Sequence, residues 1–295
     1  MANFVITACS TMDLSPEYAR ERNIKFLNFK YYLDGAEHLD DMFESMTAKG
    51  FYNAMVAGAD TKTSQVNVEA YMEFFRDLLS QGNDVLHIAF SSGLSGSYNS
   101  AKIAASEIRD EFPDRKLLLV DSLAASSGFG LFVDKIVELR NEGKTIDEAY
   151  AWACENRKRV HHWFCSSDLT FFIKGGRVSK VAGWFGTVLK ICPVLNVDYQ
   201  GKLIPREKVR GKANALKRLV DKMEENADGG LEYSDMCYIS NSDCYEDAEL
   251  VKDMIEARFP KLAGKVKIFN IGPTIGSHTG PGTVALFFMG KERID

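Results

Sequence analysis

Apolar runs alternate with segments of helical periodicity in the first half of the chain. Residues 85–90 and 116–120 are continuous apolar runs, typical of strands covered on both faces, and residues 3–7 are also β-prone. Residues 97–112 carry apolar side chains at helical spacing, and another such helix ends before Gly82. Strands and helices in this order predict a parallel sheet with helices on its faces.

The second half begins with a long helical region. Residues 132–159 are largely helical, with a break at Gly143 and a restart at residues 145–148 that resembles a capping box. Beyond this region we expect strands at residues 160–165, 193–197, 236–239, 266–269 and 283–289, and helices at residues 211–225 and 245–259.

The order of these elements predicts an α/β protein with two lobes. A chain of 295 residues is long for one domain, and a boundary fits near the strand at 160–165. We place a parallel-sheet lobe at residues 1–163 and a mixed α/β lobe at residues 164–295. An Asp34-Gly35 pair between strand-like flanks predicts a hairpin inserted in the first lobe.

Composition excludes several classes of protein. Hydrophobic residues make up 45% of the chain and charged residues 26%, which argues against disorder. A net charge of −5 argues against a nucleic-acid partner and leaves at most transient membrane contact. No apolar run approaches the roughly 20 residues that span a bilayer, and the first residues lack the basic region of a signal peptide. We therefore expect a cytoplasmic protein.

The six cysteines are scattered, without any Cys-x-x-Cys pair. Zinc sites need ligands at short, paired spacings, so we expect no metal site. Reduced and mostly buried thiols fit the expected compartment.

Two hydroxyl-rich segments precede predicted helices. Residues 61–65 read Thr-Lys-Thr-Ser-Gln, and residues 91–98 contain four serines within seven positions. In an open α/β sheet, ligands bind beyond the carboxyl ends of the strands, where helix N-termini favour an anion. Capping of the helix needs only one hydroxyl, so we favour ligand contact over capping alone.

Two glycine-rich segments complete the set. Residues 173–178 place Arg177 after paired glycines, which suits an anion but also describes an ordinary surface turn. Residues 271–283 surround His278 with four glycines, so its role is either structural or functional. Residues 155–180 carry six basic and two acidic side chains, either a solvated face or a surface that handles anions.

Known enzyme motifs are mostly absent. The chain has no Walker loop, and the Gly-x-Gly run at residues 128–130 lacks the third glycine of a dinucleotide fingerprint. A serine hydrolase acting on acyl esters through Ser95, Asp121 and His278 stays open as an alternative.

Five motifs together resemble the DegV family of bacterial fatty-acid-binding proteins over essentially the whole chain. They are Thr63-Ser64-Gln65, the run from Ser91 to Tyr98, Val120-Asp121-Ser122, Lys174-Gly175-Gly176-Arg177 and the run from His278 to Gly282. The resemblance implies two α/β lobes with a long-chain fatty acid in a tunnel between them. It also implies a carrier rather than an enzyme, without a cofactor. Some members present the carboxylate to a separate ATP-dependent kinase subunit, which forms an acyl phosphate.

The resemblance also implies roles for single residues. The carboxylate would be held by Thr63, Ser95 and His278, and Arg177 would lie near the same end of the tunnel. Further expected contacts of the anion or the partner are Ser64, Ser92, Gly96 and Thr279.

The chain departs from the family pattern at two places. Residues 8–10 read Ala-Cys-Ser where the family has Thr-Asp-Ser, and Val66 stands where proline commonly follows Thr-Ser-Gln. Neither change touches the expected carboxylate ligands. The first bears more on partnership with a kinase than on lipid binding.

Burial of an acyl chain supplies enough free energy for binding. About 15 methylenes at about 0.8 kcal/mol each are worth about 12 kcal/mol before ordering costs.

We expect Arg177 to stand apart from the carboxylate and to serve a phosphate or the partner. A further set of side chains is strongly apolar, and it either lines the tunnel or packs in an ordinary core. The set consists of Phe171, Phe172, Ile173, Trp184, Phe185, Val188, Leu189, Ile191 and Leu195.

Overall fold

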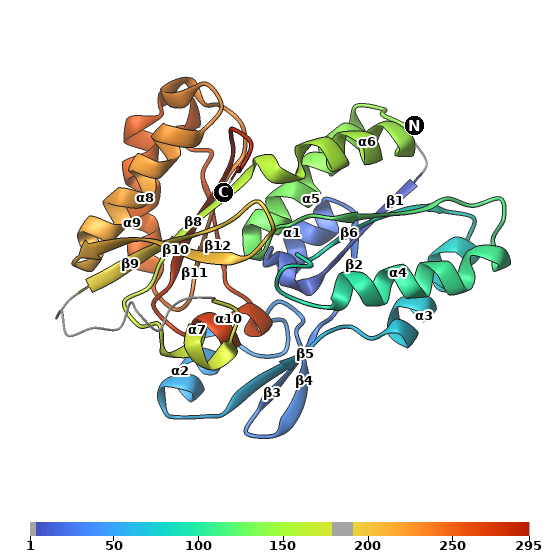
Figure 1. The fold of residues 1–295 in the computed structure, drawn as a ribbon, viewed down its shortest axis with the longest axis horizontal. Helices are drawn as coiled ribbons and strands as arrows, with labels where there is room; N and C mark the ends of the chain where they lie inside the picture. Colours follow the sequence, from blue (N-terminus) through green and yellow to red (C-terminus); the bar gives the residue numbers. More distant parts are fainter. Residues whose placement is uncertain (1–3, 179–190, 295) are drawn as a thin grey trace.

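The computed structural model describes residues 4–178 and 191–294, and its first sheet is parallel, with the strand order β2-β1-β6-β7. The strands are β1 (Phe4–Cys9), β2 (Ile24–Leu27), β6 (Asp84–Ala89) and β7 (Leu117–Asp121). The helices of this part are α1 (Pro16–Glu21), α3 (Val68–Ser80), α4 (Ser97–Ile108), α5 (Ser126–Asn141) and α6 (Ile146–Asn156). Figure 1 shows α3 and α4 on one side of this sheet and α5 and α6 on the other, which confirms the predicted parallel arrangement.

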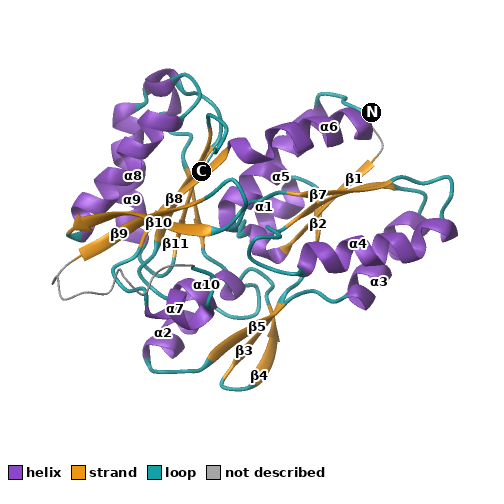
Figure 2. Cartoon of the chain, in the orientation of Figure 1, coloured by secondary structure: helices purple, strands orange, loops and turns teal. Residues whose placement is uncertain are grey.

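The second sheet has the strand order β10-β9-β8-β13-β11-β12. Its strands are β8 (Val160–Cys165), β9 (Ile191–Val197), β10 (Leu203–Arg210), β11 (Cys237–Asn241), β12 (Lys267–Asn270) and β13 (Val284–Met289). All neighbours are antiparallel except β11 and β12, so the sheet is mixed. The helices α8 (Lys212–Asn226) and α9 (Tyr245–Arg258) pack beside it (Figure 2).

A small antiparallel sheet with the order β4-β3-β5 projects below the two larger ones (Figure 2). It consists of β3 (Lys30–Leu33), β4 (Ala36–Leu39) and β5 (Thr61–Ser64). The short helices α2 (Ala48–Val56), α7 (Thr170–Gly175) and α10 (Pro273–Thr279) lie around it, and α10 contacts α2, α7, β3 and β5. Short 3-10 helices lie at Ser10–Met12, Arg109–Glu111, Arg157–Arg159, Gly230–Glu232 and Pro260–Leu262.

Several local predictions are confirmed. The strand predicted at 160–165 is β8, and Thr145 forms a capping box with Glu148 at the start of α6. The predicted hairpin joins β3 to β4, and Asp34 and Gly35 both have positive φ, at 50° and 83°. Two successive residues with positive φ are what a tight two-residue hairpin turn requires.

Other predictions are corrected by the structure. The segments expected as ligand loops at residues 61–64 and 273–279 form β5 and α10. The strand β7 was expected to be covered on both faces, and α4 and α6 do contact it from the two sides of the sheet, although Leu117, Leu118 and Leu119 stay half-buried at the sheet edge.

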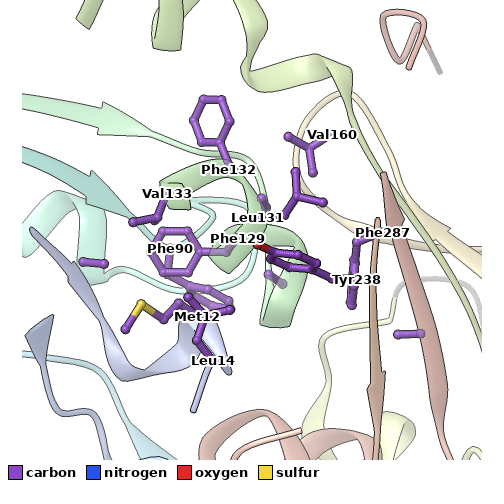
Figure 3. Close-up of a cluster of buried hydrophobic side chains, with 14 of the residues drawn as sticks. Met12, Leu14, Phe90, Phe129, Leu131, Phe132, Val133, Val160, Tyr238 and Phe287 are labelled. Atoms are coloured by element: carbon purple, nitrogen blue, oxygen red, sulfur yellow. The ribbon is translucent and has the colours of Figure 1, made fainter. Parts of the chain in front are cut away.

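The helix α5 joins the two large sheets through one core. Phe129 and Leu131 are fully buried, and α5 contacts β1 on one side and β8, β11 and β13 on the other. Figure 3 shows Phe129 between Phe90 and the pair Tyr238 and Phe287. Asp134 of the same helix is fully buried, where it accepts hydrogen bonds from Tyr18 and Arg22 at α1 and from Tyr238 on β11. The two sheets therefore share a single packed interior.

The division of the chain at residues 163 and 164 stays a prediction. These residues are consecutive positions of β8, which pairs with β9 and β13 and belongs as a whole to the second sheet. Within the part of the chain that the structure describes, no helix has the length and hydropathy needed to cross a bilayer.

Candidate functional site

A cavity of about 640 Å³ lies between the mixed sheet, the small sheet and the segments that follow strands of the parallel sheet. Its size is within the range of about 300–1,000 Å³ that is usual for small-molecule sites. Most of its wall is apolar and aromatic, including Phe29, Phe90, Phe164, Phe172, Ile275 and Phe287. Phe29 and Phe90 follow the strands β2 and β6 of the parallel sheet, and Phe164 and Phe287 lie on β8 and β13 of the mixed sheet, so the cavity is an interlobe space.

Hydroxyl groups and one histidine line part of the cavity. Thr63 lies on β5, opposite Tyr31 of β3, and His278 lies in the last turn of α10. The Thr63 Oγ1 atom is 2.7 Å from Nε2 of His278. Ser95 also lines the cavity, and its Oγ accepts a 3.2 Å hydrogen bond from the backbone N–H of Ser97. Because that bond uses the acceptor side of Ser95, its own O–H is left to donate.

His278 is neutral at physiological pH. Burial, and secondarily the positive charge of Arg177, lower the pKa of His278 to about 4 from an ordinary value of 6.5. Its Nδ1 atom is buried and has no hydrogen-bond partner among the described residues. The site can therefore offer an anion polar contacts without locking it to a charged imidazolium.

The paired glycines have separate roles. A Cβ atom on Gly175 would collide with Nδ1 of His278, so the first glycine allows α7 to approach the histidine. Gly176 has a φ of 66° and ends α7 in a left-handed conformation. Lys174 pairs with Asp60, 2.6 Å away, next to β5. The sequence signal at residues 173–178 thus reflects close packing as well as a turn.

Arg177 lies at an exposed part of the cavity wall. Its side chain is exposed, and Nη1 donates a 2.6 Å hydrogen bond to the carbonyl of Gly175. Its charge acts on His278, as the lowered pKa of that histidine records. The guanidinium is therefore available to solvent while it stays electrostatically coupled to the polar wall.

The other expected contacts divide into two groups. Ser64, Gly96 and Thr279 line the cavity, and Oγ1 of Thr279 is buried without a partner among the described residues. Ser92 is exposed and is not among the lining residues of this cavity; its hydroxyl donates a 2.6 Å hydrogen bond to Asp121. The structure thus brings together the expected residues of the site except Ser92.

The same contacts argue against the hydrolase alternative. The Asp121 carboxylate accepts hydrogen bonds from Ser92 and from the backbone N–H of Leu123. The Nε2 atom of His278 contacts Thr63, and no hydrogen-bond chain links Ser95, His278 and Asp121 among the described residues. A nucleophile needs a base within hydrogen-bond reach, and that base needs an orienting partner. The triad is not assembled.

Sequence reasoning missed much of the cavity wall. Of the apolar set expected to line it, Phe172 does so, whereas Phe171, Ile173, Ile191 and Leu195 do not, and Trp184, Phe185, Val188 and Leu189 lie outside the described residues. Ile173 is 48% exposed on the outer face of α7, which explains its absence. The missed residues include Ser126, His162 and Thr274. The available signal was positional, because Ser126 begins α5 just beyond the carboxyl end of β7.

Comparison with known proteins identifies the family. Residues 3–291 match the model of the family described as "Uncharacterised protein, DegV family". A DegV domain-containing protein of Clostridium perfringens is 38% identical over 293 residues, covering 99% of each chain. A DegV lipid-binding protein from Thermotoga maritima superposes with a TM-score of 0.84 at 28% identity, over 99% of this chain and 100% of the other. A DegV protein from Thermus thermophilus, described by its fatty-acid binding, gives a TM-score of 0.84 at 26% identity, over 98% and 100%. The chain belongs to the DegV family.

Proposed function

We propose that the protein binds a long-chain fatty acid in the interlobe cavity and grips its carboxylate with Thr63, Ser95 and His278. The observation that carries this proposal is the convergence of these three side chains on one mostly apolar cavity, with Thr63 and His278 in direct contact. The hydrocarbon chain would lie along the aromatic wall. Two structural relatives described as lipid-binding and fatty-acid-binding support the same ligand class.

The chemistry of the site suits a carboxylate that is held but not neutralised. Burying an ionised carboxylate without partners is costly, so hydrogen bonds from hydroxyls must offset its desolvation. Two hydroxyls and a neutral histidine do this without forming an ion pair. The apolar wall supplies the main free energy, about 0.8 kcal/mol for each buried methylene.

We further propose that the protein is a carrier, without an activity of its own, that presents the carboxylate to a separate ATP-dependent fatty acid kinase subunit. In that reaction a carboxylate oxygen attacks the γ-phosphorus of ATP, the bond to the leaving ADP breaks, and an acyl phosphate forms. A carboxylate held by neutral donors keeps its nucleophilicity. In this proposal Arg177, which is exposed and lines the cavity, contacts the transferring phosphate or the partner.

The ligand can be tested directly. Protein purified from cells is extracted with organic solvent, and the extract is identified and quantified by mass spectrometry. We expect about one long-chain fatty acid per chain, and a much lower yield from the Thr63→Val variant, which keeps the shape of the side chain but lacks its hydroxyl. An extract without fatty acid, from a chain that also fails to bind added palmitate, would contradict the proposal.

The hydrolase alternative predicts different results. It requires ester turnover by the isolated chain and covalent labelling of Ser95 by a serine-reactive phosphonate. We expect neither, because Ser95 and His278 do not form a hydrogen bond in the structure.

A further inference from the structure

A buried cluster of three polar side chains lies behind Ser95 and outside the cavity. Cys9 at the end of β1, Tyr71 in α3 and Ser97 at the start of α4 are each 0% exposed. The Cys9 Sγ atom is 3.1 Å from the Tyr71 hydroxyl, which is 2.8 Å from Oγ of Ser97. None of the three lines the cavity, so the cluster has no direct contact with a ligand there.

The cluster is electrically neutral. Burial raises the pKa of the Cys9 thiol to about 12, and burial also raises the pKa of Tyr71 well above its ordinary value. Both groups therefore keep their protons at physiological pH. A neutral, fully buried chain of this kind fixes positions through hydrogen bonds rather than through charge.

The cluster is joined to the site through two residues of chain. The N-cap residue of α4 is Gly96, which has no side chain that could cap the helix. Instead Ser97 is anchored through its side chain to Tyr71, and its backbone N–H donates to Oγ of Ser95. Ser95 is thus connected, through the hydrogen bonds of Ser97, to an anchor supplied by β1 and α3.

We propose that Tyr71, supported by Cys9, is a positioning residue that orients Ser95 as a hydrogen-bond donor for an anionic head group. This inference rests on the proposed function, and it gives a physical reason why the site would select carboxylates. With Ser97 held by Tyr71, the Ser97 N–H occupies the acceptor side of Ser95 Oγ, and the Ser95 O–H points its proton to the ligand. A hydrogen bond to a charged oxygen is worth more than one to a neutral oxygen, so loss of this orientation weakens acids more than alcohols.

The test compares oleic acid with oleyl alcohol, which share a hydrocarbon chain and differ at the head group. Their affinities are measured by competition against radiolabelled oleate for the wild type, Tyr71→Phe, Ser95→Ala and the double variant. We expect Tyr71→Phe to weaken oleate about 10-fold and to leave oleyl alcohol within about twofold. The double variant should bind oleate no more weakly than Ser95→Ala alone, because Tyr71 acts through Ser95.

Tyr233→Phe is the matched control. Its hydroxyl is also buried, but it donates to the carbonyl of Met236 and accepts from the N–H of Met289, away from the cavity wall. If Tyr71→Phe fails to fold, Cys9→Ala provides the second variant, because it keeps the bond between Tyr71 and Ser97 and should weaken oleate in the same selective way by a smaller factor.

The outcomes separate this inference from the proposed function. Equal weakening of oleate and oleyl alcohol in Tyr71→Phe, or losses that multiply in the double variant, would overturn the positioning role alone. A wild type that does not distinguish the acid from the alcohol would overturn both this inference and the proposed grip on the carboxylate.

Discussion

His278 and Thr63 contact each other although 215 positions separate them in the chain. The contact joins the end of α10 to the small three-stranded sheet, so the polar part of the cavity wall depends on two elements that are formed far apart in the sequence. Neither β5 nor α10 belongs to one of the two large sheets. The site is therefore a product of tertiary packing.

Replacing Ser95 with alanine should weaken fatty-acid binding about 10-fold while the fold stays intact, because one hydrogen bond to a charged oxygen is lost. The measurement is the affinity for palmitate, together with the rise in melting temperature that palmitate causes. Ser92→Ala is the control from the same segment, since Ser92 bonds to Asp121 and does not line the cavity. Equal losses in the two variants, or an unchanged melting shift in Ser95→Ala, would count against the assigned role.

Gly175→Ala should impair both stability and binding. Its Cβ would collide with Nδ1 of His278, and overpacking of this kind costs about 1–3 kcal/mol. Gly176→Ala is the neighbouring control, because a Cβ there meets nothing within 4 Å and the left-handed backbone costs about 1 kcal/mol. Urea denaturation and palmitate binding distinguish the two. Normal palmitate affinity in Gly175→Ala would show that His278 does not need this approach.

The pH dependence of stability should report His278. The pKa of His278 is about 4 in the folded protein, so the unfolded chain binds a proton below about pH 6.5 that the folded chain rejects. The contribution of His278 to stability therefore falls as the pH drops from about 6.5 to about 4, and it is constant below that window. We expect the difference in unfolding free energy between the wild type and His278→Asn to decrease over this range in urea denaturation. A difference independent of pH would contradict the lowered pKa.

Arg177→Ala should retain fatty acid but lose phosphorylation by the kinase subunit, because the exposed guanidinium is proposed to serve the phosphate or the partner. The same variant should raise the pKa of His278, since it removes a positive charge that acts on the imidazole. Measurements are the extracted ligand, acyl phosphate formation and the NMR titration of His278. Arg76→Ala is the control, an arginine of α3 that pairs with Glu111 and does not line the cavity. Loss of both retention and phosphorylation in Arg177→Ala would refute this division of roles.

Sequence patterns predicted those elements whose secondary structure is determined by their own residues. The strand β8 is a continuous apolar run, and the capping box of Thr145 and Glu148 starts a helix through local hydrogen bonds. The residues Thr63, Ser95, Arg177 and His278 entered the expected site through family motifs, and all four line one cavity.

Elements that depend on their neighbours were missed. The strand β5 reads Thr-Lys-Thr-Ser and is too short and polar for a periodic signal; its pairing with β3 makes it a strand. The helix α10 contains Gly276, a weak helix former, at a place where a Cβ would collide with the hydroxyl of Tyr52. Close packing overrides helix propensity there. The contact between Thr63 and His278 has no local signature at all.

The long separation between Thr63 and His278 also sets when the proposed head-group site can form. During synthesis, β5 emerges long before α10 exists, so the growing chain contains Thr63 before it contains His278. The head-group site is complete only after the segment containing His278 has left the ribosome and folded against the early sheet. The proposed site therefore implies that a fatty acid binds to the finished protein, because this pair of side chains is not yet present together in the nascent chain.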